Sequence, residues 1–392
     1  MIYLDNCATT PIDKEVLEAM KPYLNEEFGN PSSRHYTLAK NAEKAIETAR
    51  KQVADLINAS PDEIIFTSCA SESNNMIIKG VSDYLKYYEN AGNHIITSKV
   101  EHKSVLNTCK FLNGDLFSNR VKKVRRKVVT PPKVDRGFNV SFLDVSENGI
   151  VNIEDFKNSI TNETILASIM HGNNELGSLN DIKELSRIAK ENGVLFHSDA
   201  TQTLGKVDIN VRGLDVDFLS FSAHKLYGPK GIGAAFIKKE KLTRDMTSLI
   251  HGGSQENGFR AGTHAVHNIV GFGKACEIAK RDFDANIKHL NEMANELKTI
   301  IKAKYPNATF INEGVKSIPG VVSVFIPDIL NEMYLANLAD KIAISAGSAC
   351  SIGEPSYVID ALGKSDMTSN FLRFSVNKFI KKEDLDKLKD LI

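Results

Sequence analysis

The stretch EIIFTSCASESNN, residues 63–75, combines three local patterns that together decide the fold. Residues 63–67 form a short apolar run with the character of a buried strand, and a polar Ser/Glu/Asn turn follows it. A helix is predicted from about 73 to 88. A second helix is predicted before the strand, over 39–59, from apolar residues at steps of three and four with Pro61 just beyond. Strand, polar turn and helix in this order can bind a phosphate group at the helix N-terminus.

The alternation of short strands and longer helices continues outward from this stretch. Further strands are predicted at 94–97, 165–170, 194–197, 218–221 and 232–237, with a helix over 182–192. From about residue 262 the pattern changes to long helices, such as 287–304, and short strands. We therefore predict an α/β protein with a parallel or mixed sheet covered by helices. The large domain is expected to span 15–261, and a smaller α+β domain to combine 1–14 with 262–392.

Composition excludes several classes of protein. The 392 residues include 49 basic and 49 acidic side chains, so net charge does not indicate a general polyanion binder. Five widely spaced cysteines, without a C-x-x-C pair, indicate neither a disulfide framework nor structural zinc and fit a reducing compartment. The chain starts without a signal-peptide pattern and contains no apolar run long enough to span a bilayer. We expect a cytoplasmic protein that does not associate with membranes.

One local departure from this balance is the segment 120–127, which carries six basic residues in eight positions. A solvated loop or hairpin is the simpler interpretation. The alternative is a docking surface for an acidic partner or nucleic acid. We do not expect direct binding to nucleic acid.

Polar residues follow the ends of the predicted strands, and they are Ser71, His102, Asn174, Asp199 and Lys225. Ligands of open α/β sheets bind at this edge. A hydroxyl at a helix N-terminus, an imidazole, an amide, a carboxylate and an amine together match the groups of pyridoxal 5′-phosphate.

Three of these residues have both a chemical and a structural interpretation. Lys225 could form a Schiff base with the cofactor aldehyde, although a lysine considered alone is usually a surface residue. Asp199 could keep the pyridine nitrogen protonated, or it could cap a helix. Ser71 and the backbone amides around Ala70 and Glu72 could hold the phosphate, or Ser71 could be a plain cap.

The chain resembles the cysteine desulfurases of the NifS/IscS type, which belong to the fold-type I pyridoxal-phosphate enzymes. The resemblance covers nearly the whole length. It rests on YLDNCATTP at 3–11, GNPSS at 29–33, FTSCASESNN at 66–75, EHKSVL at 101–106, NNELG at 173–177, HSDATQ at 197–202, SFSAHKLYGPKGIG at 220–233, HGG at 251–253, RAGT at 260–263, SAGSAC at 345–350 and FLRFS at 371–375.

The resemblance implies a mostly parallel seven-stranded sheet, pyridoxal 5′-phosphate as cofactor and a homodimer. Lys225 would bind the cofactor, Asp199 would pair with its ring nitrogen, and His102 would stack on the ring and shuttle protons. Asn174 and Gln202 would lie at the 3-hydroxyl side. The phosphate would be held by Ala70, Ser71, Ser222 and His224, with Thr263 from the neighbouring subunit. Arg373, assisted by Asn30, would bind the substrate carboxylate.

Cys350 is the residue on which the specific activity depends. A desulfurase converts L-cysteine to L-alanine and leaves a persulfide on a thiolate, which then passes sulfur to an acceptor protein. The small polar residues around Cys350 resemble the group of the family with a long, mobile cysteine loop, although the segment before Glu354 is a few residues shorter than usual. Cys7, Cys69, Cys109 and Cys276 are interpreted as structural.

The acceptor is left open by the sequence. The segment 113–138 is longer than in housekeeping members of the family, and the chain ends at Ile392 without their C-terminal extension. These differences favour a specialised acceptor, such as the machinery of DNA phosphorothioation or tRNA thiolation, over the iron–sulfur scaffold. Two alternatives to desulfuration are compatible with the same fold: another fold-type I enzyme (aminotransferase, selenocysteine lyase or carbon–sulfur lyase), and a catalytically silent binding module.

Overall fold

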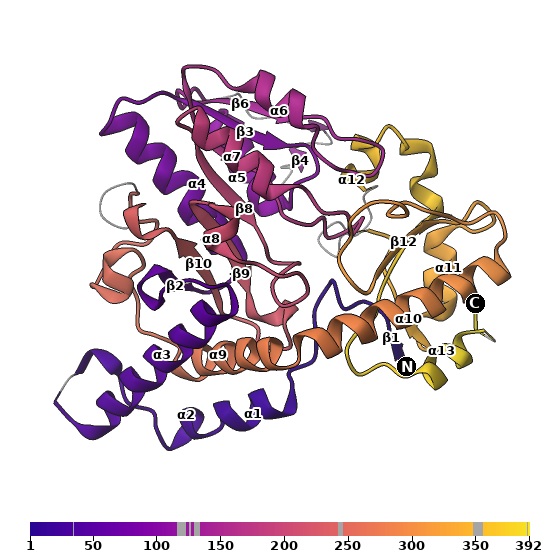
Figure 1. Cartoon of the computed structure of the whole chain (residues 1–392), viewed down its shortest axis with the longest axis horizontal. Coiled ribbons are helices and arrows are strands. Elements are labelled where there is room, and N and C mark those ends of the chain that lie inside the picture. Colours follow the sequence, from indigo (N-terminus) through magenta and orange to yellow (C-terminus); the bar gives the residue numbers. More distant parts are fainter. Residues whose placement is uncertain are drawn as a thin grey trace.

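A seven-stranded sheet forms the centre of the larger part of the molecule (Figure 1). The computed structural model describes residues 1–33, 35–115, 134–241, 246–347, 356–389 and 391–392, and the backbone of 123–124 and 127–128. The strand order is β2-β10-β9-β8-β7-β3-β6, and every neighbouring pair is parallel except the two that β10 makes. The strands are β2 (Ile64–Thr67), β3 (His94–Ser98), β6 (Asn139–Leu143), β7 (Thr164–Ser168), β8 (Leu195–Asp199), β9 (Phe218–Ser222) and β10 (Gly233–Ile237). The predicted α/β class and mostly parallel sheet are confirmed.

Both faces of this sheet are covered by helices, because alternate side chains of its strands are apolar. In β2, Ile64 and Phe66 join the hydrophobic core that contains α3 and α9, whereas Ile65 joins the core on the other face with α4 and α5. The helices of this part are α3 (Thr37–Leu56), α4 (Ala70–Tyr87), α5 (Lys103–Leu112), α6 (Ile153–Ser159), α7 (Ile182–Glu191), α8 (Val211–Leu214) and α9 (Val266–Arg281).

Two local differences from the sequence prediction concern elements near the sheet edge. Helix α4 begins at Ala70 rather than near 73, because Cys69 is extended and the Glu72 carboxylate accepts the backbone N–H of Ser68 at 2.7 Å. The polar turn is therefore the first turn of the helix. Strand β6 was not predicted, since it is a half-exposed edge strand without a continuous apolar run.

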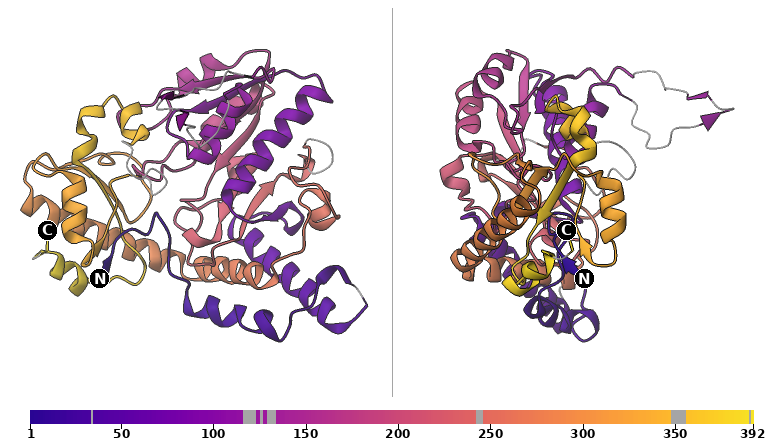
Figure 2. Two further views of the ribbon diagram at one scale, coloured as in Figure 1. Left: turned by 180° about the vertical axis from the view of Figure 1, so that it is seen from behind. Right: turned by 90° about the vertical axis from the view of Figure 1, so that its right-hand side faces the viewer.

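The smaller part has its own core around a three-stranded antiparallel sheet, β11-β12-β14. Figure 2 shows that both chain termini lie on this part, where β1 pairs in parallel with β13. Its elements are β1 (Ile2–Tyr3), α10 (Phe283–Lys304), β11 (Thr309–Phe310), β12 (Val321–Phe325), α11 (Asn331–Leu338), β13 (Ile342–Ala343), α12 (Tyr357–Ala361), β14 (Phe371–Ser375) and α13 (Lys382–Leu388).

The two parts are joined by the consecutive helices α9 and α10, which run one after the other from the larger part to the smaller one (Figure 1). Phe272 and Cys276 of α9 belong to the core of the larger part, whereas Leu290 and Leu297 of α10 belong to the core of the smaller one. Core packing therefore changes between α9 and α10.

Three features complete the description. The short helices α1 (Lys14–Met20) and α2 (Pro22–Asn25) lie near the N-terminus, where α1 packs against α9. Within the basic segment, β4 (Lys123–Val124) pairs antiparallel with β5 (Lys127–Val128), and the other residues of 120–127 lie outside the described residues. Among the helices that the structure describes, none has the length and apolar character needed to cross a bilayer.

Candidate active site

The carboxyl ends of five parallel strands meet at one edge of the large sheet, beside a cavity of about 250 Å³. Brought together at this cavity are most of the predicted site residues, namely Ala70, Ser71, His102, Asn174, Asp199, Gln202, Ser222, His224, Lys225 and Arg373. The large sheet places its strand ends side by side and so brings together the residues from Ala70 to Lys225, and β14 of the smaller part adds Arg373.

Lys225 ends a 3-10 turn, Ala223–Lys225, that directly follows β9. Its Nζ donates hydrogen bonds to the carbonyl oxygens of Cys7 and, at 2.7 Å, of Ala8. Burial, together with the cations Arg373 and Lys206, lowers the pKa of Lys225 to about 8. A substantial fraction of this amine is therefore neutral near physiological pH, as a nucleophilic lysine requires.

Asp199 is the last residue of β8 and is buried in the floor of the cavity. Its Oδ2 accepts a hydrogen bond from Asn74 Nδ2 at 2.8 Å, and its Oδ1 accepts one from the backbone N–H of Thr201 at 3.0 Å. Both oxygens are acceptors, as in a carboxylate, so the side chain can hold a protonated ring nitrogen.

The N-terminus of α4 and the end of β9 form a polar end of the cavity. Ala70 and Ser71 occupy the first turn of the 18-residue helix α4, where backbone N–H groups have no intrahelical acceptor. Strand β10 passes so close that a Cβ on Gly233 would lie 2.7 Å from the carbonyl carbon of Cys69, so only glycine fits there. Nearby, burial and the cation Lys225 lower the pKa of His224 to about 4.

Several polar side chains in the cavity wall have buried atoms without a hydrogen-bond partner among the described residues, and these atoms include Asn174 Oδ1, Gln202 Oε1 and Ser222 Oγ. Buried polar atoms are normally paired, so these atoms indicate a polar ligand. They lie in the same cavity as the amine of Lys225 and the carboxylate of Asp199. This set of groups fits pyridoxal 5′-phosphate, which has an aldehyde, a ring nitrogen, a ring hydroxyl and a phosphate.

Arg373 lies in β14 of the smaller part and is 1% exposed. Its guanidinium donates to the carbonyl oxygen of Asn174 at 2.7 Å and to Asp5 Oδ1 at 2.6 Å. The Nε atom has no partner among the described residues, so donors remain for a ligand carboxylate. A residue of the smaller part thereby completes a site built on the larger one.

Two predicted site residues that the structure describes, Asn30 and Thr263, are not in the cavity wall. Asn30 is exposed, and its Oδ1 accepts the backbone N–H of Ser32 at 3.0 Å. Thr263 is exposed in the segment before α9. Cys350 lies outside the described residues, which resume at Ser356 after Gly347.

The structure adds residues that the sequence interpretation did not assign to the site. Cys7 and Ala8 line the cavity and supply the carbonyl oxygens for Lys225, and Gln202 Nε2 also donates to the Cys7 carbonyl at 3.0 Å. Cys7 and Cys69, interpreted from sequence as structural, line the cavity. Only their places in YLDNCATTP and FTSCASESNN could have pointed to this position.

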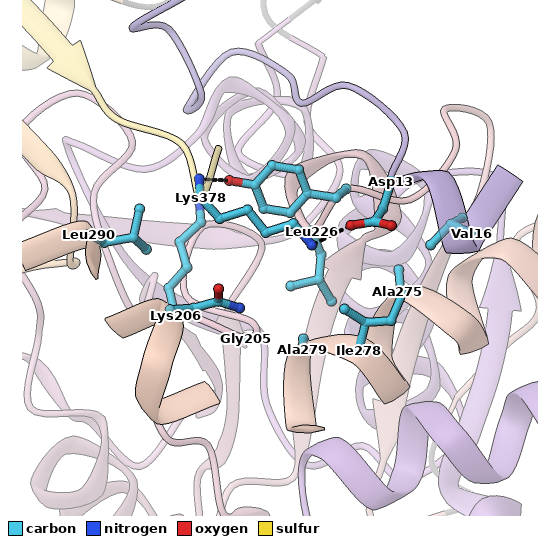
Figure 3. Close-up of a pocket in the computed structure, with 12 residues that line it drawn as sticks. Asp13, Val16, Gly205, Lys206, Leu226, Ala275, Ile278, Ala279, Leu290 and Lys378 are labelled. Carbon is cyan, nitrogen blue, oxygen red and sulfur yellow. Dashed lines mark hydrogen bonds and ion pairs between the residues drawn. The ribbon is translucent and has the colours of Figure 1, made fainter. Parts of the chain in front are cut away.

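A second, much smaller cavity of about 20 Å³ lies behind the turn that follows Lys225 (Figure 3). Lys378 of the smaller part forms an ion pair with Asp13 at 2.5 Å, and its backbone N–H donates to the Tyr227 hydroxyl at 2.8 Å. Lys206 also lines this cavity, and burial lowers the pKa of its amine. These contacts fix the Lys225 turn against the smaller part.

Comparison with known proteins assigns the family. The model of the family described as aminotransferase class-V matches residues 2–122 and 131–388. The mitosomal cysteine desulfurase of Encephalitozoon cuniculi (strain GB-M1) is 42% identical over 388 residues, which cover 98% of this chain and 84% of that protein. The cysteine desulfurase IscS of Pseudoalteromonas translucida (strain TAC 125) is 40% identical over 390 residues, covering 98% and 90%.

Solved structures agree with this assignment. A NifS-like protein superimposes with a TM-score of 0.87 at 34% identity, covering 99% of this chain and 97% of the other. The protein SspA, solved in complex with cysteine, superimposes with a TM-score of 0.80 at 34% identity, covering 97% and 100%. The chain therefore belongs to the class-V aminotransferase family and, within it, to the pyridoxal-phosphate-dependent cysteine desulfurases.

Proposed function

We propose that this chain transfers the sulfur of L-cysteine to the thiol of Cys350, releasing L-alanine. The carbon–sulfur bond of the substrate breaks, a sulfur–sulfur bond forms on Cys350, and the persulfide then donates its outer sulfur to an acceptor protein. One observation carries the proposal: a single cavity contains a lysine whose pKa is lowered to about 8, a buried carboxylate and a buried guanidinium.

The residues of the cavity have distinct proposed roles toward the cofactor. Pyridoxal phosphate, when bound, supplies an electron sink for bond cleavage next to the substrate α-carbon. Lys225 would hold it covalently, Asp199 would keep a proton on its ring nitrogen, and Ala70, Ser71, Ser222 and His224 would hold its phosphate. His102 would cover the ring and move protons, with Asn174 and Gln202 at the hydroxyl side.

The substrate end of the cavity is assigned to Arg373. Its fork-shaped guanidinium suits a bidentate bond to the α-carboxylate, and its contacts with Asp5 and Asn174 hold it in place. The complex of the related SspA with cysteine supports L-cysteine as the ligand class.

The described residues on either side of the segment 348–355, which contains Cys350, contact residues next to the cavity. Before it, Ser345 exchanges two backbone hydrogen bonds with Arg373, at 3.2 and 2.7 Å. After it, Ser356 Oγ donates to Glu175 Oε2 at 2.6 Å, and the Tyr357 hydroxyl donates to the carbonyl oxygen of Glu101 at 2.7 Å. Glu175 and Glu101 are the chain neighbours of Asn174 and His102, so both flanks start beside the cavity.

A homodimer is proposed because two residues with expected site roles, Asn30 and Thr263, lie at the surface away from the cavity of their own chain. Exposed apolar side chains in the same N-terminal segment as Asn30, Leu24 at 55% and Phe28 at 70% exposure, support burial against a second copy. Thr263 would then reach the phosphate of the neighbouring subunit.

The acceptor is proposed to be a protein of iron–sulfur cluster assembly or of a specialised pathway, such as DNA phosphorothioation or tRNA thiolation. A reducing compartment, the cytoplasm, is supported by the thiols of Cys7, Cys69, Cys109 and Cys276, which form no disulfide within the part of the chain that the structure describes.

The function is tested by single turnover of L-cysteine with the wild-type protein, Lys225→Ala and Cys350→Ser. We expect alanine and a Cys350 persulfide from wild type, and no covalently linked cofactor absorbing at about 400 nm in Lys225→Ala. Cys350→Ser should bind cysteine without releasing alanine. Pyruvate or a keto acid as product, or full turnover by Cys350→Ser, would instead identify a lyase or an aminotransferase.

A further inference from the structure

A chain of hydrogen bonds connects His102 with Asp199 through two residues that have no role in the proposed function. Asn74 lies in the second turn of α4 and is fully buried. Its Nδ2 donates to Asp199 Oδ2 and to Ser104 Oγ, both at 2.8 Å. Ser104 Oγ lies 2.8 Å from His102 Nδ1. Each link has the length of a normal hydrogen bond.

The direction of each hydrogen bond follows from its partners. The carboxylate of Asp199 can only accept, so the amide of Asn74 must turn its nitrogen toward it. The same nitrogen donates its second proton to Ser104 Oγ. The backbone N–H of Ser104 donates to His102 Nδ1 at 3.2 Å, so Nδ1 is an acceptor and the hydroxyl of Ser104 donates its proton to the same nitrogen.

We propose that Asn74 and Ser104 are positioning residues that hold neutral His102 in the tautomer protonated at Nε2. With two donors directed at Nδ1, the ring proton must reside on Nε2, the nitrogen left for the cavity that His102 lines. Asp199 sets this tautomer from a distance, because its carboxylate fixes the amide of Asn74. The carboxylate of Asp199 would thus both hold the cofactor ring nitrogen and orient His102.

The inference deepens the proposed function, since proton transfer by His102 would require a defined nitrogen facing the substrate. The tautomer of His102 can be measured without turnover. Failure of the desulfurase reaction would leave the tautomer measurable, so the two proposals fail separately.

The test is nitrogen-15 NMR of the full-length protein with histidine labelled and pyridoxal phosphate added, at about pH 8.5, where an ordinary imidazole is neutral. The His102 signals are assigned by their loss in His102→Gln. We expect wild-type Nδ1 to resonate as an unprotonated nitrogen and Nε2 as a protonated one. Ser104→Ala and Asn74→Ala should shift both signals toward a mixture of tautomers.

Two matched variants separate positioning from packing. Ser104→Thr keeps the hydroxyl and should retain the wild-type tautomer. Thr108→Val removes a buried hydroxyl one turn further along α5, which donates to the carbonyl oxygen of Ser104 at 2.7 Å, and should leave the His102 tautomer unchanged. If Asn74→Ala does not fold, Ser104→Ala decides alone.

Kinetics give the second readout. In single turnover, Ser104→Ala and Asn74→Ala should form alanine ~10-fold more slowly at saturating cysteine, a part of what a general acid–base residue contributes. Ser104→Thr should approach wild type. A wild-type signal showing Nδ1 protonated, or an unchanged tautomer in Ser104→Ala, overturns the proposal.

Discussion

The amine of Lys225 lies between two backbone carbonyl oxygens in a buried site, and its pKa falls from the ordinary 10.5 to about 8. Only the neutral amine attacks an aldehyde. Covalent capture of added pyridoxal phosphate by the cofactor-free protein should therefore accelerate about tenfold per pH unit up to pH 8 and then level off. Borohydride trapping followed by mass spectrometry measures the rate. Lys225→Ala should not be labelled at this site, and a rate that rises through about pH 10 would contradict the lowered pKa.

Arg373 is expected to bind the substrate carboxylate through the planar shape of its guanidinium as well as through its charge. Lysine in its place would keep the charge but lose the planar fork, so Arg373→Lys should raise the KM for L-cysteine by about 10-fold or more. Steady-state alanine formation measures KM. The control is Arg281→Lys, an exposed arginine paired with Glu15 at 2.9 Å, which should leave KM unchanged. An unchanged KM in Arg373→Lys would remove Arg373 from substrate binding.

Glu256 joins three elements around the segment that leads to Thr263. It accepts hydrogen bonds from Arg50 of α3 at 2.8 Å, from the backbone N–H of Phe66 in β2 at 2.7 Å and from His264 at 2.6 Å. Its own φ of 48° lies in the left-handed region, so these contacts also hold a strained backbone. Burial alone would raise the pKa of Glu256, but its hydrogen-bond donors lower it to about 2.

A carboxyl group whose pKa is lower in the folded than in the unfolded state stabilises the fold at every pH above its unfolded-state pKa. For Glu256 this contribution is complete above the ordinary pKa of 4.5 and is lost as the pH falls toward about 2. Glu256→Gln should lower the free energy of unfolding by about 3 kcal/mol at pH 7. Between the ordinary pKa of 4.5 and about pH 2, the free energy of unfolding should fall less steeply with pH in this variant than in wild type. Urea denaturation at several pH values measures this. Glu18→Gln, a control at an exposed residue, should change neither the stability at pH 7 nor its pH dependence. If the free energies of unfolding of wild type and Glu256→Gln fell in parallel with pH, the lowered pKa of Glu256 would be contradicted.

Helix α12 starts directly after the segment that contains Cys350 and is fixed by the Tyr357 hydroxyl. Tyr357→Phe removes that bond to the Glu101 carbonyl oxygen, at a cost of about 1 kcal/mol in stability. We expect slower formation of the Cys350 persulfide with unchanged cofactor absorbance, measured by mass spectrometry in single turnover. Tyr88→Phe, at a residue 73% exposed, serves as control. Equal persulfide rates in Tyr357→Phe and wild type would show that this anchor does not matter.

The proposed dimer can be tested through the position of Thr263. If Thr263 acts in the neighbouring subunit, a hybrid of a Lys225→Ala chain with a Thr263→Ala chain contains one intact site, whereas wild type paired with a chain carrying both substitutions contains none. The first hybrid should therefore bind phosphate-bearing cofactor more tightly and turn over faster than the second. Sedimentation checks that both are dimers. Equal activity of the two hybrids, or a fully active monomer, would contradict the arrangement.

Sequence alone determined the features that depend on local pattern. The period of apolar residues and the polar positions after strands predicted the α/β class and brought Lys225, Asp199 and His102 to one sheet edge, where the structure finds them around a single cavity. Strand β6 could not be predicted from the sequence, because a half-exposed edge strand has no distinctive apolar period.

Tertiary structure alone decided the contacts between distant segments. The carbonyl oxygens of residues 7 and 8 bind Lys225 across more than 200 positions, and Asp5 pairs with Arg373 across 368. The link from Asp199 through Asn74 and Ser104 to His102 also crosses three separate elements. No local period encodes such contacts, because they arise only when packed helices and strands bring backbone and side-chain polar groups within hydrogen-bond distance.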